Sequence, residues 1–391
     1  MNRVLAAAAV AIGLLASPAQ AEIRIAHVYG KTGALEAYAR QSHEGLLLGL
    51  EYATGGTMEI GGEKIVVIEK DTQLKPDVGR AVLAEAYGDD DALLAVGDVS
   101  SGVALAMLPV AEEHGRILIV EPAVADSITG ADRNRFIFRT GRNSSQDAIA
   151  NAVALGGEGV RIATLAQDYA FGRDGVAAFR EALADTGAKI VHEEYVPQDT
   201  TDFTAAAERI FNAMKDAGGD RKLLYIIWAG ANNPMGRINA MNPGRFGIRI
   251  ASGGNILSAL AAYKELPGME GATYYYYEIP QNPANKWLVK THQERFGAPP
   301  DFFTAGGMAA GIAIVEAIRK AGSTDTEALI AAMEGMEWET PKGKMIFRPE
   351  DHQALQEMYH FRIKVDPAVA WGIPELVRVI GIDEMKVPVR D

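Results

Sequence analysis

The sequence contains no cysteine, although it runs to 391 residues. A chain without cysteine forms no disulfides, binds no metal through thiolates, has no cysteine nucleophile and carries no lipid on an N-terminal cysteine. Basic residues are scarce relative to acidic ones, with 38 lysines and arginines against 51 aspartates and glutamates and a formal net charge of −13. Such a charge excludes nucleic acid as the expected partner, because the protein and the phosphate backbone repel each other. Beyond the N-terminus we expect no apolar run long enough to cross a bilayer.

What the sequence does contain is an apolar N-terminus followed by an ordinary globular composition. Hydrophobic residues make up 48% and charged residues 23% of the chain, which is enough for two or three domains. Arg3 precedes an apolar stretch over residues 4–16, and Ala19-Gln20-Ala21 follows it. This pattern is typical of a secretory signal peptide over residues 1–21, cut after Ala21; the alternative is a buried N-terminal helix. We therefore expect a soluble protein exported to the periplasm.

From residue 22 onward, short apolar strands alternate with amphipathic helical stretches. Ile23–Tyr29 and Lys64–Glu69 are predicted strands, for example, and Leu35–Ala53 and Pro76–Tyr87 are predicted helices. This alternation predicts an α/β fold with parallel central sheets that helices cover on both faces. The chain contains too many such units for one sheet, so we expect two Rossmann-like lobes.

Three crossings are expected to join the two lobes. The first is predicted at Phe136–Gly141 and the third at Thr340–Gly343. The second follows a predicted strand at Ala272–Tyr277, where Pro280 and Pro283 disfavour a continuing helix. These crossings divide the chain into a first lobe of residues 22–140 plus 279–340 and a second lobe of residues 141–278 plus 341–391.

Several short motifs come close to catalytic or cofactor-binding signatures, and each lacks a required residue. The Gly-Lys-Thr of residues 30–32 has Ile25 where a phosphate-binding loop needs its first glycine. The His-Glu of residues 43–44 has Leu47 where a zinc-binding helix needs its second histidine. Residues 98–102 lack the first glycine of a nucleophile elbow. The sequence therefore predicts no metal, no cofactor and no enzyme activity.

Several segments, taken in order, resemble one known family. They are Thr32-Gly33, Val96–Gly102 with Pro109, Glu121-Pro122-Ala123, Phe138–Thr140 leading to Ser144-Ser145-Gln146, Asp168–Gly172 and Asp202-Phe203. Together they are similar to the type I periplasmic solute-binding proteins of ABC importers, the Leu/Ile/Val-binding protein family, over about residues 23–361. The resemblance implies two lobes that close on a small ligand by hinge motion, an inner-membrane permease as partner, and a monomer.

The candidate site lies where the strands of parallel sheets end. Loop amides and helix N-termini point outward there, and ligands of α/β sheets bind at that edge. Ser100-Ser101-Gly102 opens a helix after a strand, which predicts a carboxylate receptor or, alternatively, a simple helix cap. By resemblance, Ser101 is the better contact and Ala123 faces it from the opposing loop. The candidate ligand-binding residues are Tyr38, Ser100, Ser101, Gly102, Ala123, Val124, Asn143, Tyr169, Phe171, Trp228, Asn232 and Gly254.

The expected ligand follows from positions that depart from the amino-acid binders of this family. Where those proteins carry polar or acidic partners for an α-ammonium, this sequence has Ala125, Asn143, Phe171 and an acid-free loop over residues 252–255. A buried ammonium without a carboxylate partner costs several kcal/mol, so a zwitterionic amino acid is disfavoured. Aromatic residues near the predicted strand ends suit a flat ligand body.

The prediction is therefore a transport protein that binds a small organic acid, with an aromatic carboxylate favoured. One alternative is a branched-chain or other amino-acid binding protein of the same importer class. Another is a periplasmic sensor component with the same pocket and a different membrane partner. An exported hydrolase would need a catalytic triad, and the sequence offers none.

Overall fold

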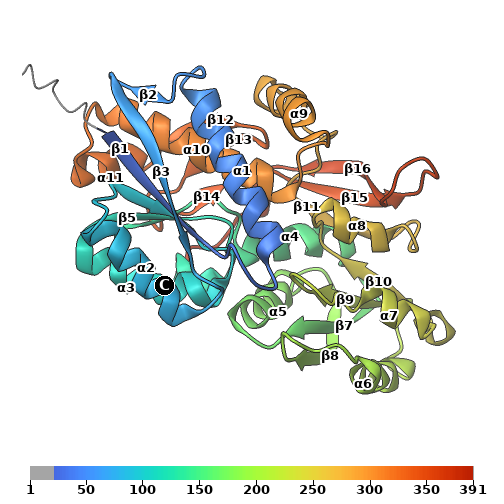
Figure 1. The fold of residues 1–391 in the computed structure, drawn as a ribbon. Helices are drawn as coiled ribbons and strands as arrows, with labels where there is room; N and C mark the ends of the chain where they lie inside the picture. Colours follow the sequence, from blue (N-terminus) through green and yellow to red (C-terminus); the bar gives the residue numbers. More distant parts are fainter. Residues whose placement is uncertain (1–21, 391) are drawn as a thin grey trace, which may run out of the picture.

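Two parallel sheets dominate the computed structural model, which describes residues 22–390 (Figure 1). The first sheet has the order β2-β3-β1-β4-β5-β6, and all its pairs are parallel except that of β2 with β3. Its strands are β1 (Glu22–Tyr29), β2 (Glu59–Ile60), β3 (Glu63–Asp71), β4 (Leu94–Val96), β5 (Ile117–Val120) and β6 (Ile137–Arg139). The second sheet is parallel throughout, in the order β10-β9-β7-β8. Its strands are β7 (Val160–Gln167), β8 (Lys189–Val196), β9 (Arg221–Ile227) and β10 (Ile248–Ser252).

Helices cover both faces of each sheet, which confirms the predicted fold class. The first sheet carries α1 (Glu36–Ala53), α2 (Pro76–Gly88), α3 (Ser101–His114), α10 (Phe302–Ala321) and α11 (Thr326–Met333). The second sheet carries α4 (Ser144–Leu155), α5 (Ala170–Ala182), α6 (Thr204–Lys215), α7 (Met235–Ala240) and α8 (Leu257–Tyr263). The remaining helices are α9 (Pro283–Phe296), α12 (Ile382–Met385) and two short 3₁₀ turns at Asp126–Ile128 and Pro243–Phe246.

The alternation of side chains along β1 explains why both faces need helices. Ile23 and Ile25 pack into the core that contains α1 and α10, whereas Ala26 and Val28 pack into the core that contains α2 and α3. Successive residues of a strand point to opposite faces, so an apolar strand without polar alternation must be buried on both sides. The second sheet behaves in the same way, with separate cores on its two faces.

Two small antiparallel sheets complete the fold. One consists of β11 (Glu270–Thr273), β15 (Met358–Lys364) and β16 (Ile373–Ile380), and the other of β12 (Glu337–Thr340), β13 (Gly343–Phe347) and β14 (Ala354–Leu355). The segment expected to be the third crossing is thus the tight turn between β12 and β13. Met345 and Phe347 of β13 share the core of the first sheet. We therefore propose that the last crossing lies between β14 and β15; the division of the chain into lobes stays a prediction.

The four consecutive tyrosines at 274–277 are not a strand, because β11 ends at Thr273. The Thr273 hydroxyl donates a hydrogen bond to the carbonyl of Tyr275 (3.0 Å), which turns the chain. The Tyr274 hydroxyl donates to the carbonyl of Phe302 (2.6 Å), and the Tyr275 hydroxyl donates to the Asn285 side chain (2.7 Å). Tyr274 and Tyr275 therefore each have a buried partner, and the segment is an irregular connection between the two sheets.

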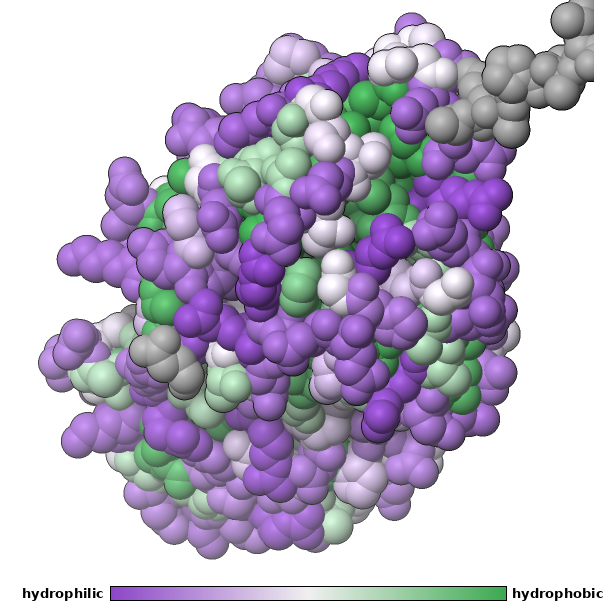
Figure 2. All heavy atoms as spheres, turned by 90° about the vertical axis from the view of Figure 1, so that its left-hand side faces the viewer, coloured by the Kyte–Doolittle hydropathy of each residue, from purple (hydrophilic) through white to green (hydrophobic). Residues whose placement is uncertain are grey.

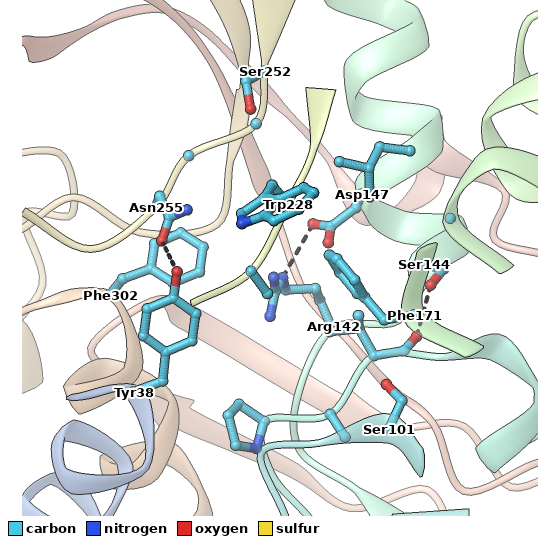
Figure 3. Close-up of a pocket in the computed structure, with 18 of the residues that line it drawn as sticks. Tyr38, Ser101, Arg142, Ser144, Asp147, Phe171, Trp228, Ser252, Asn255 and Phe302 are labelled. Carbon is cyan, nitrogen blue, oxygen red and sulfur yellow. Dashed lines mark hydrogen bonds and ion pairs between the residues drawn. The ribbon is translucent and has the colours of Figure 1, made fainter. Parts of the chain in front are cut away.

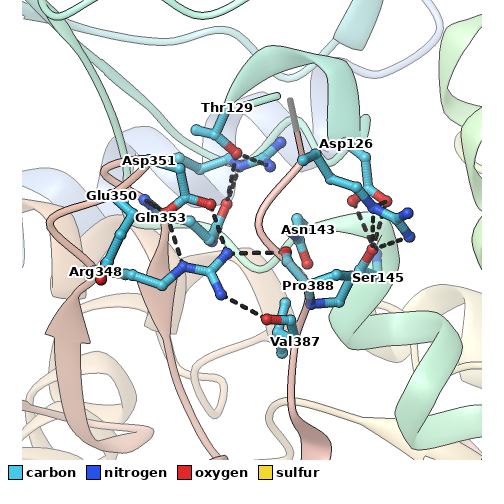
Figure 4. Close-up of polar contacts among 12 residues, drawn as sticks. Asp126, Thr129, Asn143, Ser145, Arg348, Glu350, Asp351, Gln353, Val387 and Pro388 are labelled. Carbon is cyan, nitrogen blue, oxygen red and sulfur yellow. Dashed lines mark hydrogen bonds and ion pairs between the residues drawn. The ribbon is translucent and has the colours of Figure 1, made fainter. Parts of the chain in front are cut away.

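The C-terminal segment is tied to both halves of the molecule (Figure 4). Arg348 donates to the carbonyls of Val387 (2.5 Å) and Pro388 (3.0 Å). Arg390 donates to the hydroxyl of Ser145 on α4 (2.9 Å) and pairs with Glu181 on α5 (2.7 Å). The last residues of the chain thus link the region of the first sheet to two helices of the second.

Helices α1 and α10 cross in unusually close contact because each carries two glycines on the shared face. A Cβ on Gly45 would lie 2.1 Å from the Thr304 carbonyl oxygen, and one on Gly307 would lie 2.1 Å from the Ser42 carbonyl oxygen. Gly49 and Gly311, one turn further along each helix, meet backbone atoms at 2.3 and 2.6 Å. We call these four residues the glycine seam; it lets the two backbones touch.

Helix α10 corrects one expectation from the sequence. By length and composition alone, Phe302–Ala321 is apolar enough to cross a membrane. In the structure 89% of its apolar window is buried inside the protein, so the helix serves as the central helix of the first core. By contrast, the outer face of the first-sheet half is mostly covered by hydrophilic side chains (Figure 2).

A stack of three rings lies on β1 and α1. The imidazole of His27 lies 4.1 Å from the Tyr29 ring, and His43 stacks on Tyr29 at 4.9 Å. The Nδ1 atoms of His27 and His43 share a hydrogen bond of 2.8 Å. Burial lowers the pKa of His27 well below its ordinary value, with a further contribution from His43. Both imidazoles are therefore held neutral in the folded protein.

This histidine pair predicts a loss of stability in acid. Because the pKa of His27 is lower in the folded than in the unfolded state, the unfolded chain binds more protons below about pH 6.5. The free energy of unfolding should then fall by up to about 1.4 kcal/mol per pH unit from this one group. Urea unfolding of the wild type and of His27→Phe, at pH 7.5 and 5.5, measures the effect. The same acid dependence in both proteins would contradict it.

Candidate functional site

A cavity of about 100 Å³ lies between the two sheets (Figure 3). Its walls come from segments that follow β4, β5 and β6 of the first sheet and β7, β9 and β10 of the second. Residues of α1 and the start of α10 complete it. This is the edge at which parallel sheets bind ligands. This volume is below the about 150 Å³ of a cavity that takes up benzene, so the site suits a small ligand.

Eight of the residues predicted from the sequence line this cavity: Tyr38, Ser101, Ala123, Val124, Tyr169, Phe171, Trp228 and Gly254. The other four, Ser100, Gly102, Asn143 and Asn232, are not among its lining residues. Asn143 is buried and caps α4, its side chain accepting a hydrogen bond from the Gln146 amide (2.8 Å). Asn232 is exposed. Ser100 precedes α3, and its amide donates to Asp98 (2.6 Å).

Ser101, expected to be the main carboxylate receptor, is partly engaged within the protein. Its Oγ accepts a hydrogen bond from the Ala125 amide at 3.2 Å. The side chain is buried at the first residue of α3 and touches the cavity. Its hydroxyl donates no hydrogen bond within residues 22–390, so the proton is available to a ligand. The N-cap residue of α3 is Ser100, and its side chain makes no capping bond.

Arg142 lines the cavity and was not among the ligand contacts predicted from the sequence. It follows β6, is 9% exposed, and extends into the middle of the site (Figure 3). Its guanidinium carbon lies 4.8 Å from the Tyr274 ring and 5.1 Å from the Phe302 ring, which fixes the plane of the group. Its Nε donates to Asp147 at 3.1 Å. Nη1 and Nη2 donate to no acceptor within residues 22–390.

Asp147, in the first turn of α4, is the acidic partner in the cavity wall. Burial raises the pKa of its carboxyl, and the charge of Arg142 opposes that shift. Burial alone would lower the pKa of Arg142, but Asp147 raises it above its ordinary value. The two side chains thus form a partly buried ion pair that leaves Nη1 and Nη2 of Arg142 free to bind a ligand.

Aromatic side chains form most of the remaining wall. The lining rings are Tyr38, Tyr169, Phe171, Tyr225, Trp228, Phe302 and Phe303. The hydroxyls of Tyr169 and Tyr225 hydrogen-bond to no side chain or backbone group in the described part of the chain, and Trp228 donates to the Ala231 carbonyl (2.9 Å). Rings with free hydroxyls suit a flat ligand that carries polar groups on its edge.

Two side chains bridge the cavity from one sheet to the other. The Tyr38 hydroxyl on α1 accepts from the Gly230 amide (3.0 Å) and donates to the Asn255 side chain (2.9 Å). Asp301 caps α10 and also accepts from the Leu257 amide, the first residue of α8, at 3.0 Å. Burial raises the pKa of the Asp301 carboxyl to about 6. These bridges hold the two halves in contact around the cavity.

No metal centre accompanies the cavity: within residues 22–390, no group of three or more histidine, aspartate or glutamate side chains could hold a metal ion. What the arrangement offers instead is one oriented cation with a free fork, one carboxylate beside it, and aromatic walls. Such a site can bind and orient a small molecule.

The two-sheet architecture with a ligand-sized cavity between the sheets is that of periplasmic binding proteins, and the model of that family, described as periplasmic binding protein, matches residues 22–368. The chain belongs to this family. The resemblance noted from the sequence is thereby confirmed. The protein is a periplasmic solute-binding protein of an ABC transporter and not an enzyme.

Solved structures and curated relatives show how far the similarity extends. An ABC-type branched-chain amino acid transporter structure from Rhodopseudomonas palustris CGA009 is 66% identical, covers 95% of this chain and 100% of its own, and superposes with a TM-score of 0.85. A solute-binding protein from R. palustris BisB5 in complex with 3,4-dihydroxybenzoic acid is 27% identical, with 92% and 98% coverage and a TM-score of 0.78. The leucine-, isoleucine-, valine-, threonine- and alanine-binding protein of Pseudomonas aeruginosa is 26% identical, covering 89% of this chain and 91% of that protein.

Proposed function

We propose that this solute-binding protein captures a small organic acid, and above all an aromatic carboxylate, and delivers it to an inner-membrane permease. The free guanidinium fork of Arg142 inside an aromatic cavity carries the proposal. Two parallel N–H donors match the two oxygens of a carboxylate, and a charge-assisted pair of this kind is strong when water is excluded. The surrounding rings provide contact area for a flat ligand body.

The relatives point to two ligand classes, aromatic acids and branched-chain amino acids. One relative at 27% identity is in complex with 3,4-dihydroxybenzoic acid, a small aromatic carboxylate. The structure at 66% identity is described as a branched-chain amino acid transporter, without a named ligand. We favour the aromatic acid because the walls around Arg142 consist largely of rings.

An amino acid is the second candidate, and Asp147 is the observation that favours it. The sequence predicts no acidic partner for an α-ammonium, but in the structure Asp147 lines the cavity beside Arg142. A zwitterion could place its carboxylate on the arginine and its ammonium on the aspartate. The existing ion pair argues against an amino acid. Asp147 is already paired with Arg142, so a ligand ammonium would have to compete with the guanidinium for the carboxylate.

Titration calorimetry with benzoate, benzamide and leucine tests the proposal. We expect benzoate to bind at least about tenfold more tightly than leucine, because leucine must bring an ammonium into the aromatic cavity. Benzamide has the same shape without the charge and should bind more weakly than benzoate. Tight binding of leucine together with no binding of benzoate would replace the first candidate by the second.

Three further features belong to the same proposal. We propose cleavage after Ala21, although residues 1–21 lie outside the part of the chain that the structure describes. We also propose a monomer whose two lobes close on the ligand by hinge motion at the crossings. Intact-mass measurement of the periplasmic protein should give a chain that begins at Glu22. Small-angle scattering with and without benzoate measures both the mass in solution and the closure.

A further inference from the structure

A second cation lies behind the wall of the ligand cavity. Lys342, in the turn between β12 and β13, is only 1% exposed. Its Nζ lies 4.8 Å from the centre of the Tyr274 ring, the ring on which the Arg142 guanidinium also rests at 4.8 Å. Two buried cations on one ring repel each other and cost desolvation energy. Packing alone does not explain a lysine at this buried position, because a methionine would fill a similar volume without a charge.

The backbone around Lys342 holds its ammonium in place. The Lys342 amide donates to the Thr340 hydroxyl (3.1 Å), and its carbonyl accepts from the Tyr359 hydroxyl (3.1 Å). The Asn282 side chain donates to the neighbouring Pro341 carbonyl (3.0 Å). These three hydrogen bonds fix the turn, and the Lys342 side chain contacts the Tyr274 ring without a ligand present.

Glu121 supplies the buried counter-charge. Its carboxylate accepts from the Thr140 hydroxyl (3.2 Å) and occupies a space that exists only because Gly306 has no Cβ, which would lie 2.1 Å from Oε1. The charges that face it are those of Lys342, Arg142 and Arg139. Burial raises the pKa of Glu121, and burial lowers the pKa of Lys342 to about 8. Burial thus favours the uncharged forms of both groups, the protonated carboxyl of Glu121 and the neutral amine of Lys342.

We propose that Lys342 is a specificity-determining residue of the ligand site, whose ammonium behind Tyr274 adds to the positive potential that Arg142 presents and so selects anionic ligands. This inference rests on the proposed function. A carboxylate on Arg142 stabilises the protonated form of Lys342, and by linkage the protonated lysine strengthens binding of the carboxylate. Lys342 does not line the cavity; it acts through its electrostatic field from beside the Tyr274 ring that Arg142 also contacts.

The first test compares Lys342→Met with Lys344→Met, a control on the same hairpin whose exposed ammonium pairs with Glu337. Calorimetry at pH 7 uses benzoate and its neutral analogue benzamide. For Lys342→Met we expect about tenfold weaker benzoate binding, because a positive charge near a partly buried site is lost, and unchanged benzamide binding. Lys344→Met should match the wild type. Unchanged benzoate affinity in Lys342→Met, or an equal loss for both ligands, would overturn the inference.

The second test uses the wild type alone and does not depend on the variant folding. Because the pKa of Lys342 is about 8, benzoate affinity should fall severalfold between pH 7 and pH 9 as the lysine loses its proton. The pKa values of Arg142 and Tyr274 are raised, so neither group titrates in that interval. Burial also raises the pKa of Glu121, and any ionisation of this carboxyl as the pH rises weakens benzoate binding in the same direction. An affinity that stays constant from pH 7 to pH 9 would refute the role of Lys342. Absence of benzoate binding at any pH would instead refute the proposed function, and this inference with it.

Discussion

Replacing Arg142 by methionine should lower the affinity for benzoate at least about a hundredfold. The substitution removes both free guanidinium nitrogens, and each charge-assisted hydrogen bond is worth about 1.5–3 kcal/mol. It also leaves Asp147 as an unpaired buried carboxylate facing the ligand, which adds repulsion. Calorimetry of the purified variant measures the loss directly. Arg142→Lys keeps the charge but not the fork, so it should fall between the wild type and the methionine variant.

Two controls separate ligand binding from folding in that experiment. Arg142→Met combined with Asp147→Asn removes the whole ion pair, so its melting temperature reports whether an unpaired Asp147 had destabilised the single variant. Arg173→Met removes an exposed arginine of α5 that pairs with Asp168 outside the cavity, and it should bind benzoate like the wild type. A folded Arg142→Met protein with wild-type benzoate affinity would show that the carboxylate binds elsewhere, with Ser101 as the next candidate.

A substitution in the glycine seam should strongly lower the stability of the fold. We expect Gly307→Ala to reduce the free energy of unfolding by about 3 kcal/mol, the upper end for overpacking a rigid contact. The new Cβ would lie 2.1 Å from the Ser42 carbonyl oxygen and 2.8 Å from the Leu46 amide, both backbone atoms of α1. Neither atom can move away by a rotamer change, so the two helices must separate along the glycine seam. Denaturation in guanidinium chloride, followed by circular dichroism, measures the change.

Gly236→Ala is the matched control for that substitution. Gly236 also lies within a helix, α7, but a Cβ there would meet nothing within 4 Å. Alanine should then keep or raise stability, by up to about 1 kcal/mol, because it has the higher helix propensity. Equal effects of the two substitutions would mean that the seam is looser than its geometry indicates.

The parallel sheets could be predicted because their signal is local. Apolar strands alternating with amphipathic helices, as in Ile23–Tyr29 and Leu35–Ala53, predict a doubly covered sheet without knowledge of contacts. The turn at Pro341 and Lys342 could not be placed in the same way. A proline and a glycine mark a turn equally well in a crossing and in a hairpin, and only the pairing of β13 with β12 decides between them.

The candidate site was predictable to the extent that strand ends define it. Ser101 and Trp228 were selected because they lie at the ends of predicted strands, and Gly254 was selected by resemblance to the family. All three line the cavity. Arg142 follows a strand too, but nothing local indicates whether an arginine after a strand points inward or to solvent. Its direction depends on the rings of Tyr274 and Phe302, which are far away in the sequence. Asn143 was selected because the amino-acid binders of the family carry an aspartate at its position, but its side chain caps α4 and does not line the cavity.

The glycine seam also bears on how the chain is exported. A protein delivered to the periplasm passes the inner membrane, and α10 is the described segment that is long and apolar enough to stay there. Gly307 and Gly311 make that segment less hydrophobic than leucine would, and Glu316, Arg319 and Lys320 add charges near its end. The residues that allow close packing in the folded state therefore also disfavour lateral escape into lipid during translocation. Larger apolar side chains in the glycine seam would therefore have two effects: they would disrupt helix packing in the core, and they would favour retention of α10 in the inner membrane during export to the periplasm.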